Sequence, residues 1–77
     1  MEKDLIEYIA KCLVDDPSAV SIAVVEGEKS TILELRVAAS DIGKVIGKHG
    51  RIAKAMRTVL QAATAKGGRH TVLEILD

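Results

Sequence analysis

The 77-residue sequence predicts an α+β domain in which three helices cover one face of a three-stranded mixed sheet. Two observations lead to this fold class. Apolar residues recur at helical spacing in some segments and alternate at strand spacing in others, and these segments follow one another in the order α-β-β-α-α-β. No linker, repeat or low-complexity tract separates them, so residues 1–77 are predicted to form a single domain. The core should be aliphatic, because Tyr8 is the only aromatic residue.

The first half of the sequence predicts a helix followed by a hairpin. From Glu2 to Val14, apolar residues fall at three- and four-residue spacings, which indicates an amphipathic helix. The segment Asp-Asp-Pro-Ser ends this helix, because proline disfavours helical geometry in the residue before it. Ala19 to Glu26 is short and rich in β-branched residues, and in Thr31 to Ala38 apolar residues alternate with charged ones. Both are predicted strands, joined by a turn at residues 27–30.

The second half predicts two helices and a last strand. Ser40 is placed to cap a short helix that runs to about Ile46, and a second helix follows the glycine-containing segment after it. The second helix should end at the Gly-Gly pair, and its predicted buried stripe is Ile52, Met56, Val59 or Leu60, and Ala63. Residues 69–76 form the third predicted strand. If it pairs with the second strand the two are parallel, because the helical pair supplies the long crossover.

Charge is segregated along the chain although the net charge is zero. Between Ile42 and Leu73 there are seven lysines and arginines and no acidic residue, whereas the rest of the chain has four basic and eleven acidic residues. A segment of this kind produces a local positive field that the net charge hides. It favours a polyanionic ligand, although a solvated helix face gives the same pattern.

Two glycines interrupt the helical pattern in the middle of this basic segment, in the sequence Gly47-Lys48-His49-Gly50. A glycine inside a helix costs about 1 kcal/mol relative to alanine, so the interruption needs a reason. Glycines would let a sugar-phosphate strand approach the backbone closely, and the first amides of the next helix form an anion site. Taken alone, however, the G-x-x-G spacing is equally typical of an ordinary turn between helices.

The segment VIGKHGRIAKAM, Val45 to Met56, resembles the signature of KH domains, which has an aliphatic pair, G-x-x-G and then an amphipathic helix. With the order of elements, the resemblance implies the type II KH fold over nearly the whole chain. The sequence departs from the signature at Ala53, where KH domains often have a larger aliphatic residue. Ile52 and Met56 are expected to supply the missing bulk. The resemblance implies a non-catalytic module whose G-x-x-G loop holds the backbone of single-stranded RNA.

The resemblance and the charge pattern together give the expected RNA-binding residues. The loop backbone should hold phosphates, neighbouring cations should add charge, and aliphatic side chains should support the bases. The predicted residues are Gly47, Lys48, His49, Gly50, Arg51, Lys54, Lys44, Ile46, Val45 and Ile52, with Ile42 and Arg57 as further contributors.

The resemblance is strongest to small stand-alone bacterial KH proteins, and it implies partners and a cellular role. Such a protein is expected to form a homodimer or to pair with a larger KH protein of the Jag type (KhpB). Its role would be that of an RNA chaperone or post-transcriptional regulator linked to cell elongation and division. No cofactor, metal, small-molecule substrate or membrane association is expected. A cytoplasmic location is expected because the first residues lack the pattern of a signal peptide.

Two other classes of function compete with RNA binding. A helix-turn-helix protein that binds duplex DNA also has two helices joined by a glycine turn. However, Gly50 stands where a recognition helix prefers a capping residue, and the flanking strands suit a sheet-backed groove better. An enzyme or zinc site would have to use Cys12, His49 and His70, which are predicted to lie on different elements. Cys12 is expected to be a small buried side chain.

Overall fold

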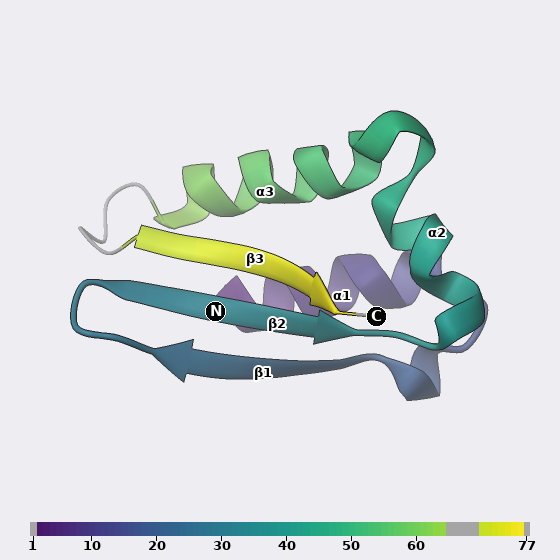
Figure 1. The fold of residues 1–77 in the computed structure, drawn as a ribbon, viewed down its shortest axis with the longest axis horizontal. Coiled ribbons are helices and arrows are strands. Elements are labelled where there is room, and N and C mark those ends of the chain that lie inside the picture. Colours follow the sequence, from purple (N-terminus) through teal and green to yellow (C-terminus); the bar gives the residue numbers. More distant parts are fainter. Residues whose placement is uncertain (1, 65–69, 77) are drawn as a thin grey trace.

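The structure is a computed structural model that describes residues 2–64 and 70–76, in which three strands form one sheet in the order β1-β2-β3 (Figure 1). Strand β1 (Ser21–Glu26) pairs antiparallel with β2 (Ser30–Arg36), and β2 pairs parallel with β3 (His70–Leu76). The crossover from β2 to β3 runs through two helices, as a parallel pair requires. The predicted mixed sheet and the predicted order of elements are confirmed.

Three helices supply the second layer. Helix α1 (Glu2–Leu13) lies behind the sheet in Figure 1, and α3 (Arg51–Thr64) runs alongside β3. The short helix α2 (Ile42–Ile46) lies near the end of the sheet where β2 and β3 terminate. No helix within the described residues is both long and apolar enough to cross a membrane.

The core is aliphatic, as predicted, and all three helices pack into it. Its central residues come from the three helices, from β2 and β3 and from the segments on either side of η1, and Ile22 of β1 packs against them from a partly buried position. The apolar residues with almost no exposed surface are Ile6, Ala10, Leu33, Leu35, Val45, Met56, Leu60 and Leu73. In α3 the buried stripe is Ala53, Met56, Leu60 and Thr64. Ala53, the position at which the sequence departs from the KH signature, is therefore a core residue. Of the predicted stripe, Met56 and Leu60 are buried as expected and Ile52 is half-buried, whereas the expectation for Ala63 is wrong because this residue is exposed.

Several predicted boundaries are wrong by one to two residues, for local reasons. Helix α1 ends at Leu13, one residue before the predicted end, and the 3-10 turn η1 (Pro17–Ala19) delays the start of β1 to Ser21. Strand β2 includes Ser30, whose carbonyl accepts a hydrogen bond from the amide of Gly27 at 2.8 Å. Arg69 and the Gly67–Gly68 helix end were also predicted, and these residues lie outside the described part of the chain.

Two side chains were assigned wrong environments. Ser40 does not cap a helix: it lies inside the 3-10 turn η2 (Ala39–Asp41), and Asp41 occupies the residue before α2. Cys12 is exposed on α1 instead of buried. Its position on the helix places it away from Ile6 and Ala10, the two α1 residues that enter the core.

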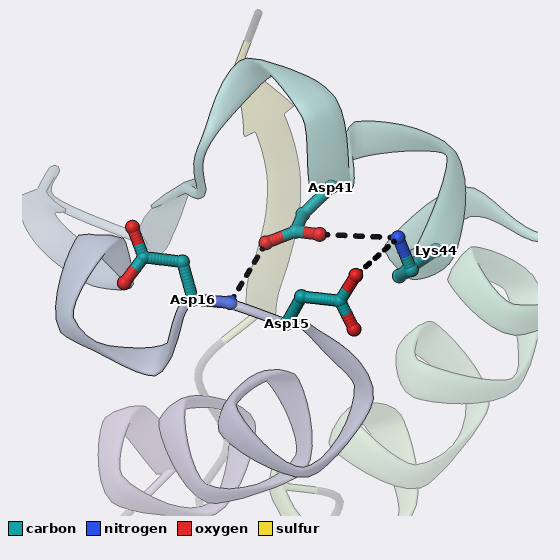
Figure 2. A network of polar contacts seen from close by, with 4 residues as sticks. All are labelled: Asp15, Asp16, Asp41 and Lys44. Atoms are coloured by element: carbon teal, nitrogen blue, oxygen red, sulfur yellow. Dashed lines mark hydrogen bonds and ion pairs between the residues drawn. The ribbon is translucent and has the colours of Figure 1, made fainter.

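A polar network joins the end of α1 to the start of α2 (Figure 2). The Asp41 carboxylate, which is only 1% exposed, accepts a hydrogen bond from the amide of Asp16 at 3.1 Å. The Nζ atom of Lys44 lies 3.3 Å from Asp41 Oδ1 and 3.1 Å from Asp15 Oδ2. A carboxylate in this position needs these partners, because a buried charge without them is costly. We call Asp15, Asp16, Asp41 and Lys44 the aspartate–lysine clamp.

The clamp shifts the pKa of both of its central groups. Burial alone would raise the pKa of Asp41, but the amides of Asp16 and Asp15 and the Lys44 ammonium outweigh it and hold that pKa below its usual 3.8. The hydrogen bond to Asp15, then that to Asp41, raises the pKa of Lys44 above its usual 10.5. Both charged forms are therefore stabilised in the folded protein.

The lowered pKa of Asp41 predicts a specific acid dependence of stability. Because this pKa is lower in the folded state than in the unfolded state, ionised Asp41 stabilises the fold above about pH 4, and this contribution is lost as the pH falls through the folded value. Asp41→Asn should be less stable than the parent at pH 7, and the difference should shrink below about pH 4. Urea unfolding from pH 7 to pH 3 measures it, with Glu74→Gln, an exposed carboxylate on β3, as the control. A difference that stays constant to pH 3 would contradict the prediction.

Candidate nucleic-acid interface

The loop of residues 47–50, here called the GKHG loop, reverses the chain between α2 and α3 through left-handed backbone conformations. The φ angles are 77° at Gly47, 59° at His49 and 74° at Gly50, and residues 48–50 form the 3-10 turn η3 (Lys48–Gly50). Side-chain-bearing residues are disfavoured in this region by about 1–2 kcal/mol, whereas glycine is not. Two of the three positions are therefore glycines. His49 is the exception, and histidine is among the residues that tolerate this conformation best.

The two glycines have different surroundings. A β-carbon at position 47 would lie 2.6 Å from Cγ1 and 3.0 Å from Cβ of Ile52, so the side chain of Ile52 occupies that space. At position 50 the corresponding direction is open, with no atom within 4 Å. The close approach of a strand to the glycine backbone stays a prediction, but on this side Ile52 already fills the space at Gly47. Its missing side chain makes room for Ile52, and only Gly50 is open on this side.

The loop amides are also divided between internal and available groups. The amide of Gly47 donates to Gly43 O at 2.9 Å, that of Gly50 donates to Gly47 O at 3.1 Å, and that of Arg51 donates to Lys48 O. These three amides are used to build the turn. The amides of Lys48 and His49, the first two residues of η3, are not used by the hydrogen bonds that build the turn. The anion site predicted from the whole loop and the helix start therefore narrows to these two groups at the loop itself.

Cations surround the available amides. The cations Lys48, Arg51 and Lys54 and the imidazole of His49 are exposed on the GKHG loop and the first turn of α3. In the part of the chain that the structure describes, no carboxylate forms an ion pair with any of them. This corner of the molecule therefore carries an uncompensated positive charge, which would attract a polyanion.

Two of the predicted cations are engaged elsewhere. Lys44 pairs with the Asp15 and Asp41 carboxylates in the clamp. The Arg57 Nε donates to the carbonyl oxygen of Leu73 at 3.3 Å, which attaches α3 to β3. These internal roles were not predicted from the sequence. The three-residue spacing between Asp41 and Lys44 was a weak signal for their pairing, but nothing in the sequence relates Asp15 or Leu73 to these side chains.

The aliphatic residues predicted to support bases differ in how exposed they are. Ile46, at the end of α2, is 37% exposed, while Ile42 and Ile52 are half-buried. Val45 is 0% exposed and belongs to the core, so its side chain has no surface to offer a base. The apolar surface beside the GKHG loop therefore consists of Ile46 with parts of its two neighbours.

The residues considered for catalysis or metal binding stay on separate elements. Cys12 lies on α1, His49 in the GKHG loop and His70 at the first position of β3. Among residues 2–64 and 70–76, no group of three or more His, Cys, Asp or Glu side chains is arranged to hold a metal ion.

Comparisons with known proteins identify relatives of this chain. A family model described as "KhpA/KhpB, KH domain" matches residues 3–75. The chain is 60% identical over 76 residues to "RNA-binding protein KhpA" of Borreliella burgdorferi, which covers 99% of this chain and 93% of the relative. It is 58% identical over 74 residues to the protein of that name from Clostridium acetobutylicum, covering 96% and 99%, and 53% identical over 77 residues to that from Treponema pallidum, covering 100% and 96%.

Solved structures show the same fold in a larger protein. Two structures of Era match with a TM-score of 0.64 and 20% identity over 96% of this chain, one from Aquifex aeolicus bound to GDP.AlF4- and one in complex with MgGDPNP and nucleotides 1506–1542 of 16S ribosomal RNA. The match spans only 29% and 28% of those chains, so it concerns the fold alone. The α+β architecture with its mixed sheet is the type II KH fold that the sequence predicts. The matched family is non-enzymatic, and the chain belongs to it: this is a member of the KhpA/KhpB family of KH-domain proteins.

Proposed function

We propose that this protein binds single-stranded RNA without catalysis, with the sugar-phosphate backbone lying on the GKHG loop. The observation that carries the proposal is the grouping at one corner of two amides that the turn does not use, those of Lys48 and His49, with cations that have no carboxylate partner among the described residues. The relatives named as RNA-binding proteins support the choice of RNA as the polyanion. The open side of Gly50 gives a strand room to approach the backbone.

The physical contributions to binding are electrostatic and steric. Amide N–H groups and the Lys48, Arg51 and Lys54 side chains hold phosphates, and counterion release makes the affinity fall steeply with salt. Ile46 and the exposed part of Ile52 support bases by apolar contact. Because these side chains offer no hydrogen-bonding groups to base edges, sequence preference is weak. A second binding module would raise the affinity through avidity.

Partners and cellular role follow from the family. We propose that this single KH domain acts in the cytoplasm as a homodimer or with a Jag-type KH protein (KhpB), as an RNA chaperone or post-transcriptional regulator linked to cell elongation and division. The family model covers both KhpA and KhpB, so the proposed partner carries a KH domain of the same family. The competing proposal of duplex DNA binding has no support, because the two helices pack on a sheet and the named relatives bind RNA.

Reversing the charge of the GKHG loop should abolish binding without unfolding the protein. Lys48→Asp with His49→Asp replaces a cation and a neutral side chain by two anions on an exposed loop, so we expect at least about a tenfold loss of affinity, which corresponds to about 1.4 kcal/mol. Fluorescence anisotropy with a pool of short single-stranded RNAs measures it, and circular dichroism monitors the fold. The matched control is Lys29→Asp, an exposed lysine in the β1–β2 turn at the far end of the sheet (Figure 1). Equal binding by the loop variant and the parent would remove the loop from the site.

The two loop glycines should respond differently to alanine. Gly50→Ala places a side chain in open space at positive φ, so we expect a loss of about 1–2 kcal/mol in unfolding free energy and weaker RNA binding. Gly47→Ala should lose about 1–3 kcal/mol more, because its methyl group overlaps Ile52. Urea unfolding measures both.

A double-mutant cycle isolates the steric part of the Gly47 effect. With Ile52→Ala in place, the additional cost of Gly47→Ala should fall, because the overlapping side chain is gone. Additive effects of the two substitutions would show that Ile52 is not the reason for glycine at position 47.

A further inference from the structure

The aspartate–lysine clamp lies at the base of α2, the helix that leads directly into the GKHG loop (Figure 2). We propose that Lys44 and Asp41 are positioning residues for RNA binding, which fix the orientation of α2 and of the loop, and that Lys44 does not contact phosphate. This inference rests on the proposed RNA-binding function. It reverses the prediction from sequence, in which Lys44 is one of the cations that contact or attract the nucleic acid.

The ion pairs that Lys44 already makes oppose a contact with phosphate. Its ammonium lies 3.1 Å from Asp15 and 3.3 Å from Asp41, so two carboxylates already neutralise it. Asp41 is buried, and drawing Lys44 away would leave a carboxylate inside the protein without its cation. An incoming phosphate would have to offset that penalty, whereas Lys48, Arg51 and Lys54 bind without breaking an ion pair in the described chain.

The position of the clamp explains how it can act on the loop. Helix α2 has five residues, which is too short to be stable without tertiary contacts. Its Val45 side chain enters the core on one side, and Lys44 and Asp41 attach it to the segment after α1. Gly47 is the residue directly after α2, and its amide donates a hydrogen bond to the carbonyl oxygen of Gly43 in that helix. Any tilt of α2 is therefore transmitted to the available amides at Lys48 and His49.

The salt dependence of RNA binding separates a positioning role from a phosphate contact. For single strands, each phosphate contact contributes about 0.7 to the slope of log K against log salt concentration. Lys54→Gln should make the slope shallower by about that amount. Lys44→Gln should weaken binding by a similar factor at every salt concentration and leave the slope unchanged. A slope that becomes shallower in Lys44→Gln as it does in Lys54→Gln would overturn the inference.

Asp41→Asn gives a second test, in which the two roles predict opposite signs. Removing a negative charge near the RNA would tighten binding if only the overall field mattered. If the clamp positions the loop, the same variant should bind about threefold to tenfold more weakly, because the binding groups are less well preorganised. Tighter binding by Asp41→Asn, measured on protein shown by circular dichroism to be folded, would overturn the inference. Lys44→Arg, which keeps a cation between the two carboxylates, should restore most of the affinity lost in Lys44→Gln, and failure to do so would also count against it.

The design distinguishes failure of the inference from failure of the proposed function. If the parent does not bind the RNA pool, or if neither Lys54→Gln nor the charge-reversed loop changes binding, the proposed function is wrong. If those variants behave as expected while Lys44→Gln makes the slope shallower or Asp41→Asn binds more tightly, the inference alone is wrong and Lys44 contacts the RNA.

Discussion

The packing of Ile52 against the bare α-carbon of Gly47 determines where the GKHG loop lies. Helices α2 and α3 must meet at a sharp corner, and the first buried turn of α3 brings the Ile52 side chain to the place where a β-carbon would stand at position 47. Glycine at that position, with its positive φ, lets the corner close. The rest of the loop follows from this contact: the turn of residues 48–50 carries the exposed residues Lys48 and His49, whose amides the turn does not use.

The charge of the interface depends on which cations the fold uses for itself. The basic segment supplies cations to the helical crossover, but Lys44 neutralises two aspartates and Arg57 attaches α3 to the edge of β3. What remains near the loop is Lys48, Arg51 and Lys54, all within one turn of the corner. The fold thus turns a charge pattern spread over more than thirty residues into a local field at one corner. A field of this extent suits a few phosphates better than a long duplex.

The fold was predictable because its determinants are local or periodic. Apolar residues alternate with polar ones in β2 and recur at three- and four-residue spacing in α1, and these patterns specify strands and helices. Because Tyr8 is the only aromatic residue, the core has to be aliphatic. Side-chain environment was less predictable where neighbours distant in sequence decide it. Val45 and Ile46 are adjacent aliphatic residues that their residue type alone does not distinguish, yet the first is in the core and the second at the surface. The ion pair between Asp15 and Lys44 spans 29 positions, and no spacing rule reports it.

The division of labour between the two glycines limits what a G-x-x-G match can establish by itself. One glycine of the pair is explained entirely by packing inside the protein, and this would hold in any chain with a bulky side chain at the start of the second helix. The motif alone therefore supports a tight helix–helix corner as strongly as it supports a ligand site. What distinguishes the two is the combination of an open second glycine, amides that the turn does not use, and cations without carboxylate partners in residues 2–64 and 70–76. This corner has all three, and it is their coincidence that makes it a place where a nucleotide backbone can lie.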